Sequence, residues 1–218
     1  MRKKDEIRRF LRRDIISGKL MQGERITESG LTEKFKCSRG PVRESLIQLC
    51  KEGFIELTEN RGAIVKKLSA KEIRDYYSLL EIMERKSVEW STLNLKDSEI
   101  DRLIILNNSL KNLDPNDENF IEEWCVRNSA FHDIFRNRCG NDKMSWITNE
   151  IRQRIFRYLF SSLMAGLRKE YLEDHQNIIA AIQRKDPIEA GKIMEQHIAR
   201  AKNFLLQFLK QTDAYEDK

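Results

Sequence analysis

The hydrophobic and polar positions of this chain follow two patterns, which change near residue 69. Before it, short segments with helical spacing are combined with two stretches in which apolar and polar residues alternate. After it, the apolar positions keep a helical spacing, and no segment alternates convincingly like a strand. The pattern predicts a mainly α protein with a small N-terminal domain (residues 1–69), an all-α helical bundle (residues 70–212) and a polar tail (residues 213–218).

The best-defined helix of the first domain is predicted between residues 38 and 53. Ser38 suits the N-cap, Pro41 falls in the first turn, where its missing N–H is harmless, and Gly53 suits the stop. The apolar residues repeat at helical spacing and predict a buried stripe of Val42, Leu46 and Leu49.

Two arginines mark the outer face of this helix. Arg39 and Arg43 lie four residues apart, so both project from one face near the N-terminus, where the helix dipole is positive. A short helix with such an end suits the major groove of DNA. The alternative is a solvent-exposed basic face without a ligand.

The neighbouring segments favour DNA binding, because they complete a winged helix-turn-helix. Amphipathic helices are predicted at residues 6–16 and 27–36, and alternating strands at 54–58 and 62–66, joined by a hairpin. The predicted contacts to double-stranded DNA come from the helix and from this wing: Ser38, Arg39, Gly40, Arg43, Arg61 and Gly62.

The distribution of charge supports this interpretation. Residues 1–69 carry a net charge of +7 and the remainder −2, within a total of +5. A local basic excess supplies much of the sequence-independent affinity for phosphates.

The cysteines and the length of the apolar segments bear on the cellular location. The four cysteines form no CxxC pair, so we expect them to be reduced rather than in a disulfide or thiolate metal site. No apolar segment is long enough for a signal sequence or a membrane span. We therefore expect a cytoplasmic protein that does not enter the membrane.

The second domain is predicted to begin with a capping box, Ser69 to Glu72. Pro115 and Pro187 each follow an aspartate and are predicted to start helices. Six helices are predicted, at residues 70–94, 97–113, 115–138, 142–164, 168–185 and 187–211.

All three histidines of the chain fall in this bundle, each on a different predicted helix. Asn128 lies four residues before His132 and shares its helix face. Together with His175 and His197, these residues could provide three imidazoles and one oxygen to a divalent transition metal. The alternative is ordinary surface or hydrogen-bonded core histidines, since spacing alone cannot bring three helices together.

Residues 5–67 resemble the GntR family of bacterial transcription regulators. The matching motifs are Gly-Lys-Leu-Met-Gln-Gly-Glu-Arg-Ile-Thr-Glu at 18–28 and Ser-Arg-Gly-Pro-Val-Arg-Glu-Ser-Leu at 38–46. Gln22 replaces the usual proline, and Gly40 replaces the usual threonine. The second change removes a hydroxyl that could contact DNA.

Residues 70–210 resemble the FCD ligand-binding domain of the FadR branch of this family. The marks are Asn-Ser-Ala-Phe-His at 128–132, Cys-Gly-Asn at 139–141, His-Gln-Asn-Ile-Ile-Ala-Ala-Ile at 175–182 and Met-Glu-Gln-His-Ile at 194–198. The resemblance implies a bound divalent metal, commonly Zn or Ni, with Asn128, His132, His175 and His197 as its ligands.

Two departures from the family pattern affect the expected effector. The family often has aspartate at position 128, and the neutral asparagine leaves the metal charge uncompensated, which favours a carboxylate effector. The family often has arginine four residues before Glu84, where this chain has Leu80. This weakens the case for a dicarboxylate, although Arg152 and Arg154 could supply a replacement cation.

The resemblance therefore implies a homodimeric repressor of a palindromic operator, controlled by a small organic acid or sugar acid near the metal. One alternative is a metal-dependent enzyme, but the chain has no His-Glu-x-x-His sequence and no nucleophile motif. Another is a purely structural dimerisation bundle whose histidines bind no metal.

Overall fold

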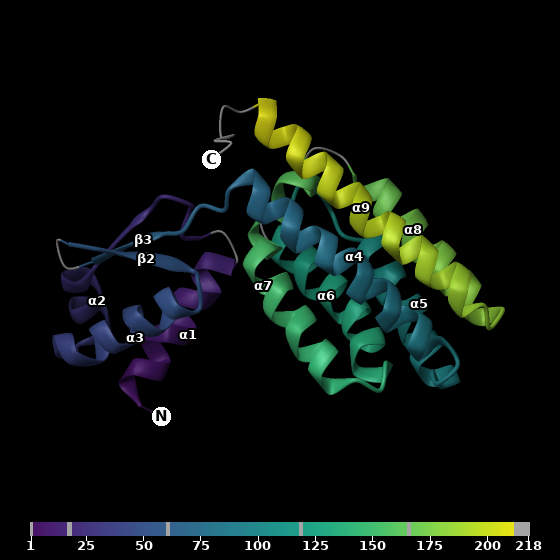
Figure 1. The fold of residues 1–218 in the computed structure, drawn as a ribbon, viewed down its shortest axis with the longest axis horizontal. Helices are drawn as coiled ribbons and strands as arrows, with labels where there is room; N and C mark the ends of the chain where they lie inside the picture. The colour runs from purple at the N-terminus through teal and green to yellow at the C-terminus, as the bar shows by residue number, and fades with distance from the viewer. Residues whose placement is uncertain (1, 17–18, 60–61, 118–119, 165–166, 212–218) are drawn as a thin grey trace. The chain divides into compact units, whose positions relative to one another are not determined.

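The computed structural model describes residues 2–16, 19–59, 62–117, 120–164 and 167–211 (Figure 1). The chain divides into two compact units, Met1–Leu68 and Ser69–Lys218. Arg61 and the tail at 213–218 lie outside the described residues.

The first unit is a winged helix-turn-helix, as predicted. Its three strands form an antiparallel sheet in the order β1-β3-β2, with Ile26 opposite Ala63 and Leu57 opposite the same residue. Strand β1 was not predicted, because an alternation of only three residues, with one buried side chain, is too short to indicate a strand. In chain order the elements are α1 (Lys3–Ile16), β1 (Arg25–Thr27), α2 (Glu28–Phe35), α3 (Arg39–Lys51), β2 (Ile55–Thr58) and β3 (Gly62–Val65).

Helix α3 has the predicted limits and the predicted buried face. Ser38 occupies the N-cap position, although its side chain makes no capping hydrogen bond. Gly53 has a φ of +77°, a conformation in which glycine is favoured after a helix. The predicted stripe of Val42, Leu46 and Leu49 is buried, in one core with Ile7 and Leu11 of α1.

The second unit consists, in its described part, of six helices. Helix α4 packs along α9 and also contacts α6 and α7, while α8 lies against α9 and α5 (Figure 1). The predicted capping box at Ser69 and Glu72 is present at the start of α4. The helices are α4 (Ala70–Thr92), α5 (Asp97–Lys111), α6 (Phe120–Arg138), α7 (Asp142–Met164), α8 (Arg168–Gln183) and α9 (Pro187–Gln211).

The two prolines of the bundle behave differently. Pro187 starts α9, and the Oδ1 of Asp186 accepts a hydrogen bond from the backbone N–H of Glu189 at 3.0 Å. The prediction for Pro115 was wrong, since α6 begins at Phe120. Here the side chain and carbonyl of Asp114 accept hydrogen bonds from the N–H groups of the next residues, which closes a turn instead of starting a helix.

No helix in the described ranges is long and apolar enough to cross a lipid bilayer.

Candidate functional site

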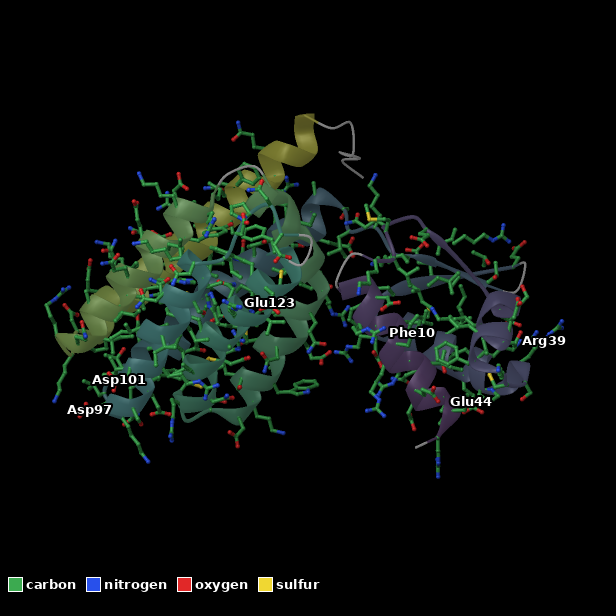
Figure 2. All side chains as sticks on the ribbon, turned by 180° about the vertical axis from the view of Figure 1, so that it is seen from behind. Phe10, Arg39, Glu44, Asp97, Asp101 and Glu123 are labelled. Atoms are coloured by element: carbon green, nitrogen blue, oxygen red, sulfur yellow. The ribbon has the colours of Figure 1, made fainter. Side chains whose placement is uncertain are left out.

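The N-terminus of α3 presents an exposed polar surface. Ser38, Arg39 and Gly40 are all exposed, and Arg39 projects into solvent from the first turn (Figure 2). Arg43, one turn further on, is also exposed, with 47% of its side-chain surface accessible. These four predicted DNA-binding residues therefore lie on one accessible surface at the positive end of the helix.

Arg43 is held in place by a carboxylate from the preceding helix. Its Nε donates hydrogen bonds of 2.9 and 3.1 Å to the two carboxylate oxygens of Glu28. Glu28 is buried at the start of α2, where Thr27 caps the helix. This ion pair fixes the direction of the guanidinium group and ties the two helices of the helix-turn-helix together.

Gly62 lies within the sheet and is buried, so the structure does not place it on the exposed surface of the wing. It pairs with Thr27 on one side and with Thr58 on the other. A Cβ atom here would meet the carbonyl oxygen of Ile26 at 2.6 Å. Close packing of the strands accounts for this glycine.

The three histidines of the bundle meet in its interior. His132 comes from α6, His175 from α8 and His197 from α9, and all three are buried. One ring nitrogen of each lies within 4.8 Å of those of the other two. The packing of the helices thus supplies the convergence that the sequence could not establish.

His175 has the most enclosed ring. It stacks on Phe131, with 3.9 Å between the ring centroids and 14° between the planes. Neither Nδ1 nor Nε2 has a hydrogen-bond partner in the described part of the chain. Two buried polar atoms without partners are unusual, because each loses its hydration without compensation. A metal ligand is one role that explains such a ring.

Carboxylates lie behind the other two rings. The Nδ1 of His132 is 3.5 Å from Oε2 of Glu84, and the Nδ1 of His197 is 3.3 Å from Oδ2 of Asp174. Glu84 is fully buried and also bonds Arg136 at 2.7 Å and Arg152 at 3.0 Å through its Oε1.

The buried surroundings determine the charge states of His132, His175 and Glu84. Burial lowers the pKa of His132 to about 3, with a further contribution from the charge of Arg152. Burial also lowers the pKa of His175 well below its ordinary value. Burial alone would raise the pKa of Glu84, but Arg136 and Arg152 outweigh it and hold that pKa far below its usual range. At neutral pH, His132 and His175 are therefore neutral, as a metal ligand must be.

A cavity of about 50 Å³ adjoins two of the histidines. Asn128 and Arg152 line it together with His132 and His197, and Leu80 forms part of its wall. Arg154, half-buried on the same helix as Arg152, is not among the described residues that line it. The remaining lining residues are Tyr77, Ile155, Tyr171, Ile198 and Ala201.

Three charged residues that surround the histidines had no predicted role. Arg136 lies four residues after His132 and so shares its helix face, and Asp174 directly precedes His175. The first spacing could have indicated Arg136, whereas Asp174 contacts His197 of another helix, and adjacent residues do not share a helix face. No spacing indicated Glu84, because it comes from another helix, 48 positions before His132, and the family resemblance marked it only as a reference position for Leu80.

A winged helix-turn-helix joined to a helical bundle with a buried histidine cluster is the architecture of a transcription regulator with a DNA-binding domain and a second, helical domain. The comparisons agree with this class. Residues 3–65 match the family model described as bacterial regulatory proteins of the gntR family, and residues 75–200 match the FCD domain. The chain belongs to the GntR family and is a DNA-binding transcription regulator rather than an enzyme.

The curated relatives include transcriptional repressors. The HTH-type transcriptional repressor GlaR of Escherichia coli K12 is 30% identical over 201 residues, which cover 87% of this chain and 90% of the relative. The gluconate operon transcriptional repressor of Bacillus licheniformis is 28% identical, covering 81% and 74% of the two chains. The solved structure of McbR/YncC from Escherichia coli has a TM-score of 0.80 at 18% identity, covering 95% of this chain and 99% of that one, and so shares its fold.

Proposed function

We propose that this regulator represses transcription as a homodimer on a palindromic operator, and that a small carboxylate bound beside a divalent metal in the bundle controls its affinity for DNA. In this proposal residues 1–69 bind DNA, and residues 70–212 bind the metal and effector and form the dimer. The observation that carries the proposal is the buried cluster of three histidines beside a cavity that also contains Arg152.

The residues of the cluster fit a divalent transition metal. His132, His175 and His197 would provide neutral imidazoles, and Asn128 would provide an amide oxygen. The unpartnered ring nitrogens of His175 support this assignment. Zn and Ni both suit such a set of ligands. When bound, the metal would supply a positive charge that attracts an anion.

The charge of the cavity lining suits an acid. Arg152 provides a cation on its wall, while Leu80 provides an apolar surface where the family often has arginine. A single carboxylate would balance the charges of Arg152 and the metal, whereas a second carboxylate would lie against the apolar side chain of Leu80. A relative is a gluconate operon repressor, and gluconate is a sugar acid. We therefore propose a small organic acid or sugar acid with one carboxylate as the effector.

The proposed DNA surface consists of Ser38, Arg39, Gly40 and Arg43 of each protomer, with Arg61, which the sequence predicts in the hairpin. The exposed arginines at the positive end of α3 support it. A dimer with two such helices would contact two half-sites, so the operator should have two-fold symmetry.

The proposal is tested by operator binding and metal analysis of the same preparation. Footprinting upstream of neighbouring genes supplies the operator, and fluorescence anisotropy then gives its affinity with and without gluconate. We expect a two-fold footprint, about one Zn or Ni per protomer, and weaker operator binding when the acid is added. Arg102 is an exposed arginine on the bundle helix α5, so Arg102→Ala is the matched control for the loss of charge in Arg39→Ala and Arg43→Ala.

Two results would contradict this scheme. A monomer with an asymmetric footprint would exclude the dimer. A protein that carries no metal, gains no stability from Zn or Ni and responds to the acid unchanged after His175→Ala would exclude the metal, leaving the bundle as an effector or dimerisation domain only.

A further inference from the structure

Two of the three histidines are oriented by a carboxylate on the same ring atom. The Nδ1 of His132 faces Glu84 at 3.5 Å, and the Nδ1 of His197 faces Asp174 at 3.3 Å. Glu84 Oε2 and His132 Nδ1 are both buried without a hydrogen-bond partner among the described residues, and they face each other in this ion-pair contact. In both cases the second ring nitrogen, Nε2, is left for another ligand.

Arginines hold each carboxylate in place. Oε1 of Glu84 accepts hydrogen bonds from Arg136 and Arg152, which leaves Oε2 for the histidine. Both carboxylate oxygens of Asp174 accept from Arg200, at 3.2 and 3.4 Å. The orientation of the carboxylates is therefore fixed by ion pairs that do not involve the histidines.

A fixed, ionised carboxylate determines the tautomer of the ring in front of it. An ionised carboxylate can only accept hydrogen bonds, so the facing nitrogen must carry the hydrogen. With hydrogen on Nδ1, a neutral imidazole has its lone pair on Nε2, the form that binds a metal through Nε2. His175 has no such partner, and its ring is positioned by the stack on Phe131.

We infer that Glu84 and Asp174 are positioning residues, which hold His132 and His197 as Nδ1–H tautomers with Nε2 directed to the metal. This inference rests on the metal site proposed above. Glu84 has a further part, because the same carboxylate also holds Arg152, the cation of the cavity wall. One buried carboxylate thus orients both a metal ligand and the group proposed to bind the effector.

The simpler explanation is that both carboxylates serve only as ion pairs within the bundle, and Glu89 offers a matched control. Glu89 lies on α4 with Glu84, is also buried, and pairs with Arg85 and Lys86. No contact between Glu89 and a histidine is found in the described part of the chain. Glu89→Gln therefore removes a buried, paired carboxylate without changing a metal ligand.

The first measurement is made on the metal-free parent protein. The chain has three histidines, so labelling with ¹⁵N-histidine gives long-range ¹H–¹⁵N spectra with only three rings. We expect His132 and His197 to be Nδ1–H tautomers, and Glu84→Gln and Asp174→Asn to abolish the preference at their own histidine. A parent protein with Nε2–H at both rings would overturn the inference, whether or not any variant folds.

The second measurement is Zn²⁺ affinity, by competition with a chromophoric chelator. Loss of an outer partner of a metal-bound histidine typically reduces affinity 10–100-fold. We expect this loss of Zn²⁺ affinity for Glu84→Gln and Asp174→Asn, and the visible spectrum of bound Co²⁺ should change in both variants. For Glu89→Gln we expect less than a twofold change in Zn²⁺ affinity. Equal losses in all three variants, with an unchanged Co²⁺ spectrum, would mean a structural role only.

These measurements separate the two proposals. If the parent binds neither Zn²⁺ nor Co²⁺, the metal site is wrong, and the tautomers still show whether the carboxylates orient the rings. If the parent binds metal but the tautomers and affinities do not depend on Glu84 or Asp174, the metal site stands and the positioning role is wrong.

Discussion

Replacing His175 with leucine should change the stability of the bundle in opposite directions with and without metal. In the metal-free protein both ring nitrogens of His175 are buried without a partner in the described residues. Such a group costs about 1–3 kcal/mol relative to a partnered one. His175→Leu removes this cost and keeps an apolar side chain of similar size against Phe131. In EDTA we therefore expect the variant to equal the parent or to exceed it by up to about 2 kcal/mol.

Added metal should reverse this order. A ligand that binds only the folded state stabilises it by about 2.7 kcal/mol at 100 times its Kd and about 4.1 kcal/mol at 1,000 times. For a chain of this size, this corresponds to a rise of roughly 5–15 °C in the Tm of the parent. The variant lacks one of the three imidazoles proposed to hold the metal and should gain much less.

The assay is thermal and urea unfolding followed by circular dichroism, in EDTA and in excess Zn²⁺. Ile178→Leu, a buried change of similar size one turn further along α8, controls for altered packing and should shift both conditions equally. The assignment of His175 as a ligand is refuted if the variant gains as much stability from Zn²⁺ as the parent does. A large loss of stability in EDTA would mean that its nitrogens have partners in solution.

Three further predictions concern the DNA surface, the cavity and pH. Arg39→Ala and Arg43→Ala should each weaken operator binding by about 1–3 kcal/mol and relax specificity at one position per half-site, measured by anisotropy on substituted operators. Arg152→Leu should weaken the gluconate response at least tenfold while Zn content, measured by mass spectrometry, stays near one per protomer. The lowered pKa of His132, about 3 against 6.5 in the unfolded chain, means that the unfolded state binds more protons in this window. The free energy of unfolding in EDTA should therefore fall as pH decreases from about 6.5 towards 3, and less so in His132→Gln.

Local signals predicted the elements that carry function. The N-cap position of Ser38, the turn at Gly53 and the spacing of Val42 and Leu46 located α3 without tertiary information, because caps and helical periodicity are properties of neighbouring residues. The capping box at Ser69 located the start of the bundle in the same way.

The errors arose where local signals were short or ambiguous. Strand β1 has one buried residue, Ile26, and forms only because β3 provides its hydrogen-bond partner. An aspartate–proline pair starts a helix at Pro187 but closes a turn at Pro115. Gly62 looked like part of an exposed wing, but the close approach of Ile26 explains it.

The histidine cluster shows a different limit. Composition and spacing identified the three residues and their separate helices, but not that their rings converge, since this depends on how α6, α8 and α9 pack. The charged residues behind the rings are harder still, because Glu84 belongs to a fourth helix and acts through contacts with residues distant in sequence.

The arrangement of charge around the cavity gives a reason for an anionic effector that does not depend on the family. Glu84 is ionised and carries one negative charge, but two arginines bind its Oε1, so this buried group has an excess of one positive charge. Asp133 also pairs with Arg136, yet 45% of its side chain is exposed, where water screens its charge. The proposed metal ligands are neutral and would leave the metal charge uncompensated. A carboxylate entering beside Arg152 would relieve both excesses, whereas an ammonium group would add to them. The cavity should therefore discriminate between an acid and the corresponding amine by charge, before any contact with the rest of the ligand.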